Sequence, residues 1–278
     1  MVTQNHSDTF DIGGDLTVHR LGFGAMRVTG DGILGEPDDI EAARELITHA
    51  VDLGVDFIDT ADSYGPGTSE RLIREALAPY PDDIVIATKG GLLRTLDGSW
   101  PQHGDPEYLE NAIQCSLDRL GVETIDLYQF HRPDPDTPFE DSVAKFAEFK
   151  DRGLIRHVGL SNVSVEQLET AREIVEIATV QNRYNLGDRE SEDVLQACEG
   201  YGIGFIPWAP LGGADSPAVR DVAEAHDAAP RQVALAWLLD HSEVMLPIPG
   251  TSSREHLESN VAASEIDLTD EEYRRLSE

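Results

Sequence analysis

The chain has 278 residues, of which 40% are hydrophobic, and this is enough for one large globular core. The 53 acidic residues against 21 basic ones give a formal net charge of −32, which disfavours nucleic acids and anionic membranes as partners because both repel such a surface. No apolar run approaches the roughly 20 residues of a membrane-spanning helix, and the N-terminus lacks a basic segment followed by an apolar stretch, so we expect a cytoplasmic protein.

Short β-rich runs alternate with helical patterns along the chain. Residues 9–24 come first, and their central Gly-Gly-Asp predicts a small hairpin before the first full strand. The later strands are expected at residues 55–60, 83–89, 125–131, 155–161, 178–185, 203–211 and 244–250. The helices are expected at residues 36–54, 68–80, 105–121, 139–153, 163–175, 189–202, 218–241 and 253–264.

Strands separated by helices imply parallel pairing with right-handed crossovers. A closed barrel and an open doubly wound sheet both fit this order. An open dinucleotide-binding sheet is expected to carry G-x-G-x-x-G after its first strand, but this chain has GFGAMR, with Arg27 at the third glycine position. The sequence therefore predicts an α/β fold, a (β/α)₈ TIM barrel with a short N-terminal β-hairpin, in which residues 1–278 form a single domain.

Four polar side chains follow three successive predicted strands. Asp59 ends the second strand, Tyr64 lies in the loop after it, Lys89 ends the third strand, and His131 ends the fourth. Because catalytic groups of TIM barrels gather at the carboxyl ends of the strands, we expect all four at one mouth.

Each of these residues also has a plainer interpretation. Asp59 can begin a turn, Tyr64 can pack over the barrel, and His131 can be a hydrogen-bonded structural histidine. Lys89 has no such plain interpretation. An ammonium at the end of an apolar strand is costly in free energy unless a nearby carboxylate pairs with it.

Together the four residues have a clear chemical use. An ammonium beside a tyrosine stabilises the phenolate, so we predict that Lys89 lowers the pKa of Tyr64 below its ordinary value of about 10. Asp59 then holds Lys89, His131 donates a hydrogen bond to a carbonyl oxygen, and Tyr64 acts as general acid when a hydride reaches the carbonyl carbon.

The motifs FIDTADSYG, IATKGG, DLYQFH, GLSN, VQNRYN and PWAPLGG occur in this order, and the chain resembles the aldo-keto reductase superfamily over almost its whole length. The resemblance implies a (β/α)₈ barrel that binds a nicotinamide cofactor without a Rossmann motif and reduces aldehydes or ketones to alcohols. It also implies a catalytic tetrad that matches Asp59, Tyr64, Lys89 and His131.

The same resemblance implies a set of cofactor-binding residues. Ser161, Asn162 and Gln181 match the groups that bind the carboxamide, and Trp208 matches the aromatic residue that stacks on the nicotinamide ring, although it can also be a core tryptophan. The other positions implied for the cofactor are Ala25, Met26, Ala209, Leu211, Gly212, Gly250, Ser252, Arg254, His256, Ser259 and Asn260. Among these, Leu211 and Gly212 lie along the pyrophosphate, Ser252 and Arg254 can contact a 2′-phosphate, and Asn260 meets the adenine.

The chain departs from the family pattern at two cofactor positions. His256 stands where many members have Arg or Gln, and Ser259 stands where Glu or Gln is common. Arg254 keeps a planar cation suited to phosphate, so the sequence favours NADPH over NADH.

The substrate pocket is expected to include Met26, Trp100 and Arg132 beside Tyr64 and His131. The N-terminal motifs are similar to those of pyridoxal reductases and other small-aldehyde reductases, and an apolar pocket with few polar groups suits an aromatic or aliphatic aldehyde. Trp100 can equally be a packing anchor.

Two further functions stay open at this point. One is a regulatory, redox-sensing subunit that binds cofactor with little turnover, as relatives of this barrel do in ion channels. The other is an aldolase that forms a Schiff base on Lys89.

The cysteines and the charge pattern say less about chemistry. Cys115 and Cys198 have no Cys or His at metal-ligand spacing, so we expect neither a disulfide nor a metal site. The acidic residues are spread along the chain, and the basic ones are 18 Arg and 3 Lys. This composition resembles the surface of proteins from a high-salt cytoplasm, where ions screen self-repulsion. The alternative is an acidic protein of an ordinary cell with a cationic partner, and the sequence names no protein partner.

Overall fold

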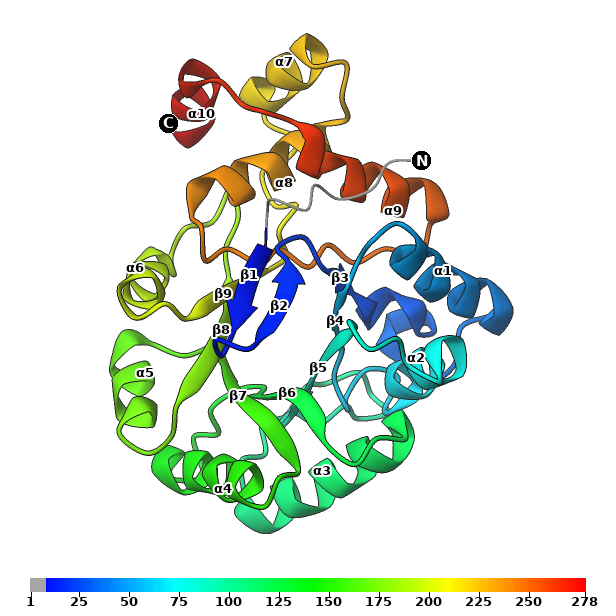
Figure 1. Ribbon diagram of the computed structural model, residues 1–278, viewed down its shortest axis with the longest axis vertical. Coiled ribbons are helices and arrows are strands. Elements are labelled where there is room, and N and C mark those ends of the chain that lie inside the picture. The colour runs from blue at the N-terminus through cyan, green and yellow to red at the C-terminus, as the bar shows by residue number, and fades with distance from the viewer. Residues whose placement is uncertain (1–8) are drawn as a thin grey trace.

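The computed structural model describes residues 9–278 and shows a parallel β-sheet that curls on itself inside a ring of helices (Figure 1). The seven strands of this sheet are hydrogen-bonded in chain order. They are β3 (Phe23–Gly24), β4 (Phe57–Asp59), β5 (Val85–Gly90), β6 (Ile125–Phe130), β7 (Ile155–Ser161), β8 (Ile177–Arg183) and β9 (Gly204–Trp208).

Residues 244–248 close the barrel between β9 and β3 without forming a regular strand. The backbone of Phe205 exchanges two hydrogen bonds of 2.7 Å with this segment, and the carbonyl of Pro247 accepts one of 2.9 Å from Gly22. Because Pro247 and Pro249 have no N–H, the ladder on this side is too sparse for a regular strand. The predicted eighth strand is thus reduced to an isolated bridge, while the predicted (β/α)₈ barrel is confirmed.

An antiparallel hairpin precedes the barrel, as the sequence predicts. It consists of β1 (Thr9–Ile12) and β2 (Leu16–His19), and its turn contains two glycines with φ of 61° and 83°. The buried apolar side chains of the hairpin pack in one cluster with Phe57 and Val85, which lie at the starts of their strands. The hairpin therefore plugs the amino-terminal end of the barrel, and the carboxyl ends of the strands face the other way.

Ten α-helices and three short 3₁₀ helices connect the strands and cover them within the described part of the chain. The helices are α1 (Ile40–Asp52), α2 (Thr68–Leu77), α3 (Pro106–Leu120), α4 (Phe139–Asp151), α5 (Val165–Arg172), α6 (Glu192–Tyr201), α7 (Pro217–Ala225), α8 (Pro230–His241), α9 (Arg254–Val261) and α10 (Asp270–Ser277), with η1 (Ala25–Val28), η2 (Asp31–Ile33) and η3 (Ala262–Glu265). Most agree with the predicted ranges.

Two features of the helical layer differ from the prediction. The single helix expected at residues 218–241 is divided into α7 and α8, because Pro230 cannot continue a helix but suits the first position of a new one. Helix α10 was not predicted. Its sequence signal is the capping box in which Thr269 and Glu272 satisfy each other's backbone N–H groups.

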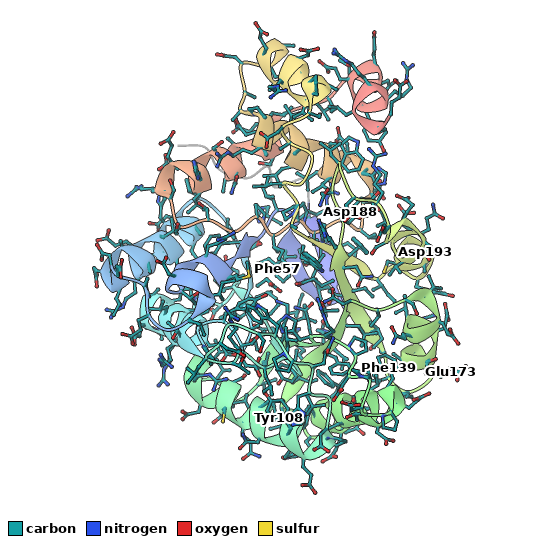
Figure 2. All side chains as sticks on the ribbon, turned by 180° about the vertical axis from the view of Figure 1, so that it is seen from behind. Phe57, Tyr108, Phe139, Glu173, Asp188 and Asp193 are labelled. Atoms are coloured by element: carbon teal, nitrogen blue, oxygen red, sulfur yellow. The ribbon has the colours of Figure 1, made fainter. Side chains whose placement is uncertain are left out.

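The interior and the surface differ sharply in composition. Figure 2 shows Phe57 inside the barrel, whereas Glu173 and Asp193 lie at the outer helices. Among the helices of residues 9–278, none combines the length and the apolar character that spanning a bilayer requires.

Candidate active site

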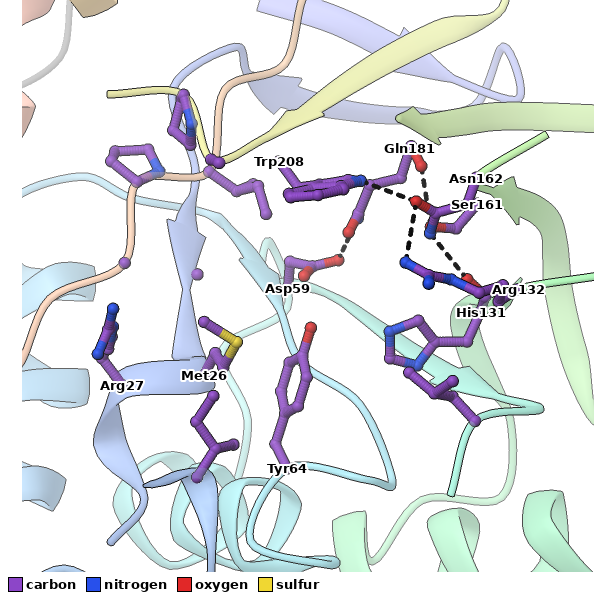
Figure 3. A pocket seen from close by; sticks show the side chains of 18 of the residues that line it. Met26, Arg27, Asp59, Tyr64, His131, Arg132, Ser161, Asn162, Gln181 and Trp208 are labelled. Atoms are coloured by element: carbon purple, nitrogen blue, oxygen red, sulfur yellow. Dashed lines mark hydrogen bonds between the residues drawn. The ribbon is translucent and has the colours of Figure 1, made fainter. Parts of the chain in front are cut away.

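A cavity of about 560 Å³ opens at the carboxyl ends of the strands (Figure 3). Two thirds of the residues that line it are positions to which the sequence assigns a role. These are Met26, Asp59, Tyr64, Trp100, His131, Arg132, Ser161, Asn162, Gln181, Trp208, Ala209, Leu211, Gly212 and Gly250. The barrel therefore brings together side chains that lie far apart in the sequence.

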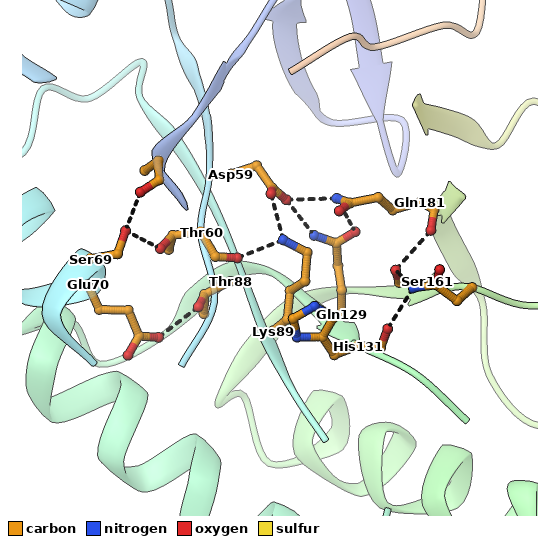
Figure 4. A network of polar contacts seen from close by, with 12 residues as sticks. Asp59, Thr60, Ser69, Glu70, Thr88, Lys89, Gln129, His131, Ser161 and Gln181 are labelled. Carbon is orange, nitrogen blue, oxygen red and sulfur yellow. Dashed lines mark hydrogen bonds and ion pairs between the residues drawn. The ribbon is translucent and has the colours of Figure 1, made fainter. Parts of the chain in front are cut away.

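Asp59 and Lys89 form a buried ion pair at the floor of the cavity (Figure 4). Lys89 Nζ lies 2.5 Å from Asp59 Oδ1 and also donates to the carbonyl of Thr60 at 2.8 Å. The other carboxylate oxygen accepts hydrogen bonds from the amides of Gln129 at 3.0 Å and Gln181 at 2.8 Å. Both charges are thus fully provided with partners, as buried charges require.

Tyr64 lies beside this ion pair, with Lys89 Nζ 5.3 Å from the centroid of its ring. Burial raises the pKa of Tyr64 above its ordinary 10.0, and the opposing field of Lys89 does not offset this effect. The predicted net lowering of the pKa is therefore wrong, because burial outweighs the ammonium. Burial also acts to lower the pKa of Lys89, but Asp59 and Tyr64 outweigh it and the pKa is raised, so Lys89 stays an ammonium.

The segment that carries Tyr64 is tied to the barrel by buried polar contacts. Thr60 donates a hydrogen bond to Ser69 Oγ at 2.7 Å, and Ser69 in turn donates to the carbonyl of Ala25 at 2.9 Å. Glu70 accepts from Thr88 on β5 at 2.7 Å, as Figure 4 shows. These bonds fix both ends of the turn, so Tyr64 keeps its place over the ion pair.

His131 follows β6 and faces Tyr64 edge-on, with ring centroids 5.9 Å apart. Its backbone N–H donates to the carbonyl of Gly90 at 2.9 Å. Burial holds the pKa of His131 well below its ordinary value, and the charges of Lys89 and Arg132 add to this effect. The imidazole is therefore neutral at physiological pH and carries one N–H.

A second polar cluster lines the cavity next to Trp208. Trp208 Nε1 donates to Asn162 Oδ1 at 3.1 Å, and Asn162 Nδ2 donates to Ser161 Oγ at 2.8 Å. Ser161 donates to the carbonyl of Gln181 at 2.8 Å, across the pairing of β7 with β8. Asn162 adopts φ of 59°, a left-handed conformation that asparagine tolerates better than most residues.

The sequence model of the Aldo/keto reductase family matches residues 20–216 and 214–278. The chain belongs to the aldo-keto reductase family. This aldo-keto reductase is 49% identical over 269 residues to an uncharacterized oxidoreductase of Schizosaccharomyces pombe, covering 95% of this chain and 88% of the relative. It is 42% identical over 275 residues to pyridoxine 4-dehydrogenase of Escherichia coli, covering 95% of this chain and 96% of the relative.

A solved structure adds to these sequence relationships. The crystal structure of an aldo/keto reductase from Klebsiella pneumoniae in complex with NADP and acetate superposes with a TM-score of 0.81 at 27% identity, covering 97% of this chain and 94% of that one. The family match and the relatives named as an oxidoreductase and a dehydrogenase make this chain an NAD(P)H-dependent oxidoreductase.

The residues around the cavity fit a nicotinamide dinucleotide. Asn260 on α9 is 2% exposed, yet within residues 9–278 neither polar atom of its amide has a hydrogen-bond partner. A buried amide without partners is costly, so a ligand that bonds with it would remove a penalty. At the other end, Trp208 offers a ring surface in the cavity.

Several predicted cofactor residues do not line the cavity. Ala25 is buried within η1, while Ser252, Arg254, His256, Ser259 and Asn260 lie in or before α9, outside the cavity lining. The side chain of Arg254 is 68% exposed and pairs with Glu258 at 3.2 Å.

Sequence reasoning missed Gln129, whose side-chain amide donates a hydrogen bond to the carboxylate of Asp59. Its signal was the period of two along β6, which puts it on the same face as His131. Sequence reasoning also left Arg27 without a role, although it lines the cavity. Among the described residues, no group of three or more His, Cys, Asp or Glu side chains gathers as metal ligands do.

Proposed function

We propose that this aldo-keto reductase reduces an aldehyde or ketone to an alcohol with NADPH, in preference to NADH, and that residues 1–278 act as one barrel domain. The observation that carries the proposal is the position of Tyr64 in the cavity wall, directly beside the buried Lys89–Asp59 pair.

Tyr64 acts as the general acid. When bound, a nicotinamide cofactor would supply the hydride that the carbonyl carbon receives. Tyr64 donates its proton to the carbonyl oxygen, and the Lys89 ammonium stabilises the phenolate that remains. Asp59 keeps Lys89 charged and in place, so the stabilising charge is preorganised before the reaction begins. The raised pKa of Tyr64 keeps the proton on the acid at neutral pH, where it is needed.

His131 orients the substrate. Because its imidazole is neutral, its single N–H can donate a hydrogen bond to the carbonyl oxygen without adding a charge. Its Nδ1 atom is buried and has no hydrogen-bond partner among the described residues, so this side of the ring offers no competing bond.

The cofactor is held from Trp208 to α9. Trp208 would stack on the nicotinamide, and Ser161, Asn162 and Gln181 would bind the carboxamide. The other contacts proposed for the cofactor are Ala25, Met26, Ala209, Leu211, Gly212, Gly250, Ser252, Arg254, His256, Ser259 and Asn260. Arg254 supports the preference for NADPH. Its ion pair with Glu258 is exposed and therefore weak, so Arg254 can leave Glu258 and bind a 2′-phosphate at little cost in free energy.

Met26, Trp100 and Arg132 shape the substrate pocket. The similarity to pyridoxine 4-dehydrogenase supports a small aromatic aldehyde such as pyridoxal as the first substrate to test. An aldolase reaction is disfavoured, because a Schiff base requires a neutral amine and the raised pKa of Lys89 keeps it an ammonium.

The experiment follows dinucleotide oxidation by absorbance with NADPH and NADH and an aldehyde panel that includes pyridoxal. We expect turnover by the wild type, about 100-fold or more loss in Tyr64→Phe, and unchanged turnover in Tyr201→Phe, an exposed tyrosine on α6. Assays in dilute and molar KCl also test the proposed adaptation to salt, which predicts higher activity in KCl.

Two results would count against the reductase. Turnover that survives Tyr64→Phe would remove the proposed acid. Tight dinucleotide binding without turnover of any aldehyde in either salt would instead favour a regulatory, cofactor-binding subunit.

A further inference from the structure

A second cleft lies on the outside of the barrel, at helices α2 and α3 of the outer ring (Figure 1). Its volume is about 440 Å³, and it shares no lining residue with the active-site cavity. Half of its lining residues are arginines, in a chain that has only 21 basic residues against 53 acidic ones. The lining residues are Arg71, Arg74, Glu75, Ala78, Asp118 and Arg119.

The gathering of these three cations is unfavourable by itself. Arg71 and Arg74 stand three residues apart on α2, so they are neighbours on one face of the helix, and Arg119 of α3 lines the same cleft. Like charges at this spacing repel one another. An anion bound between the three guanidiniums would replace this repulsion by attraction.

Two of the arginines are held at the cleft by glycines. Arg119 lies over Gly67, where a Cβ would stand 2.5 Å from its Cδ, and Arg74 lies over Gly121, where a Cβ would stand 2.6 Å from its Nε. The two glycines have φ of 76° and 71°, which residues with a side chain rarely adopt. A side chain at either position would displace the arginine, so the glycines fix where these guanidiniums lie.

The two arginines of α2 keep nitrogen atoms available for a ligand. Within residues 9–278, Arg71 makes contacts through Nη2 only, with Thr68 Oγ1 at 3.1 Å and with the carboxylate of Glu36 at 3.9 Å. Arg74 donates through Nη1 only, to the carbonyl of Asp118 at 2.9 Å. Each guanidinium has three nitrogen atoms that carry hydrogen, so two of them stay without a partner in each residue.

Arg119 is held more firmly but also keeps a donor. Its Nε donates to the fully buried carboxylate of Glu70 at 2.5 Å, and its Nη2 donates to Ser116 Oγ at 3.2 Å. Nη1 has no partner in the described part of the chain. Arg119 therefore stays in place at the inner side of the cleft while one of its nitrogen atoms can bind a ligand.

The two carboxylates of the lining do not pair with these arginines. Glu75 forms an ion pair of 2.9 Å with Arg44 on α1. Asp118 is exposed, and its carboxylate takes part in no ion pair within residues 9–278. The three guanidiniums are thus left to an external anion, and the N–H fork of arginine matches the oxygens of phosphate.

We propose that this cleft binds a phosphate group, as inorganic phosphate or on a small phosphate ester, between Arg71, Arg74 and Arg119. A tetrahedral anion with several oxygens can accept from all three guanidiniums at once, since they come from two helices. The site shares no residue with the active-site cavity, so this inference does not rest on the proposed function.

The test is calorimetric titration of the full chain, without dinucleotide or substrate and at constant ionic strength, with inorganic phosphate and with phenyl phosphate. Arg71→Gln and Arg74→Gln should each weaken binding about tenfold, the loss of one charge-assisted contact. Both residues are exposed, so the variants should fold, and denaturant unfolding checks this. The matched control is Arg220→Gln on α7, an exposed arginine whose side chain has no hydrogen bond or ion pair within residues 9–278.

The outcomes separate a built site from a general effect of charge. Weakening in Arg71→Gln and Arg74→Gln, with binding by Arg220→Gln unchanged, supports the site. Tighter binding of phenyl phosphate then identifies an ester as the ligand, and tighter binding of inorganic phosphate identifies the free ion. Equal weakening in all three variants, or a wild type that binds neither probe, overturns the proposal.

A further variant tests whether the phosphate binds in the active-site cavity instead. Arg27→Gln removes a cation of that cavity and makes the same change in net charge. We expect it to bind both probes as the wild type does. Weakening confined to Arg27→Gln would place the phosphate in the active-site cavity and overturn the proposal. Neither result changes the expected reduction of carbonyl compounds, so the proposed function is tested separately.

Discussion

The carboxylate of Asp59 accepts hydrogen bonds from three side chains, whereas the equally buried amide of Asn260 bonds to none within residues 9–278. Asp59 lies at the end of strand β4 and lines the cavity, whereas Asn260 lies on helix α9, outside the residues that line it. Beneath Tyr64, the chain itself supplies every hydrogen-bond partner of the Lys89–Asp59 pair that is described above. The charges that the reaction needs are therefore already in place. On α9, the amide of Asn260 is left without a hydrogen-bond partner within residues 9–278. On the proposed function, the groups that carry the chemistry are preorganised by the protein, while the amide of Asn260 would gain its partner from the adenosine end of the cofactor.

The largest expected effect comes from removing the buried Lys89–Asp59 ion pair at the floor of the cavity. Lys89→Met leaves Asp59 as a buried charge without its counter-ion, and we expect a loss of about 3 kcal/mol in the free energy of unfolding together with loss of turnover. Denaturant unfolding and the aldehyde assay measure the two effects. The double variant Asp59→Asn/Lys89→Met should regain part of the stability but none of the activity. Full stability in Lys89→Met would mean that the ion pair is not needed to hold the floor.

A matched pair of substitutions sharpens the comparison between the two regions. Gln129→Leu removes a donor to Asp59 and should destabilise the protein by about 1–2 kcal/mol. Asn260→Leu has nearly the same shape but removes an amide that has no partner in the described chain, so unfolding should become no easier. Dinucleotide binding should weaken about tenfold in Asn260→Leu only. Equal destabilisation by both variants would mean that the amides of Gln129 and Asn260 contribute alike to stability.

The smallest effect concerns pH. Because the pKa of Tyr64 is raised, the phenol keeps its proton through neutral and mildly alkaline pH, and the rate of carbonyl reduction should fall only when pH rises through that raised pKa. The pKa of His131 is lowered, so its ring is already neutral at pH 6.5, and no inflection is expected there. Alcohol oxidation needs the phenolate as base and should rise with pH over the alkaline range. Rates of reduction falling between pH 7 and 9, in step with a Tyr64 titration, would contradict the raised pKa.

Much of this arrangement follows from local sequence. The alternation of β-rich runs with amphipathic stretches predicts the barrel, and Gly-Gly-Asp predicts the hairpin, because periodicity and turn chemistry act over a few residues. Asp59, Lys89 and His131 could be found because each comes at the end of a predicted strand, and parallel strands bring such ends to one edge.

The rest depends on residues that meet only after folding. The pKa of Tyr64 is raised because the protein buries its hydroxyl. The sequence indicates that Lys89 lies near Tyr64, but it does not reveal how deeply the hydroxyl is buried. The closure by a segment with two prolines, the pairing of Arg254 with Glu258 and the exposure of Arg27 beside Gly250 likewise depend on tertiary packing. The chemical groups that stand at the strand ends follow from local sequence. Which of these groups have partners within the chain and which remain for a ligand follows from folding, because burial and pairing depend on distances between residues far apart in the sequence.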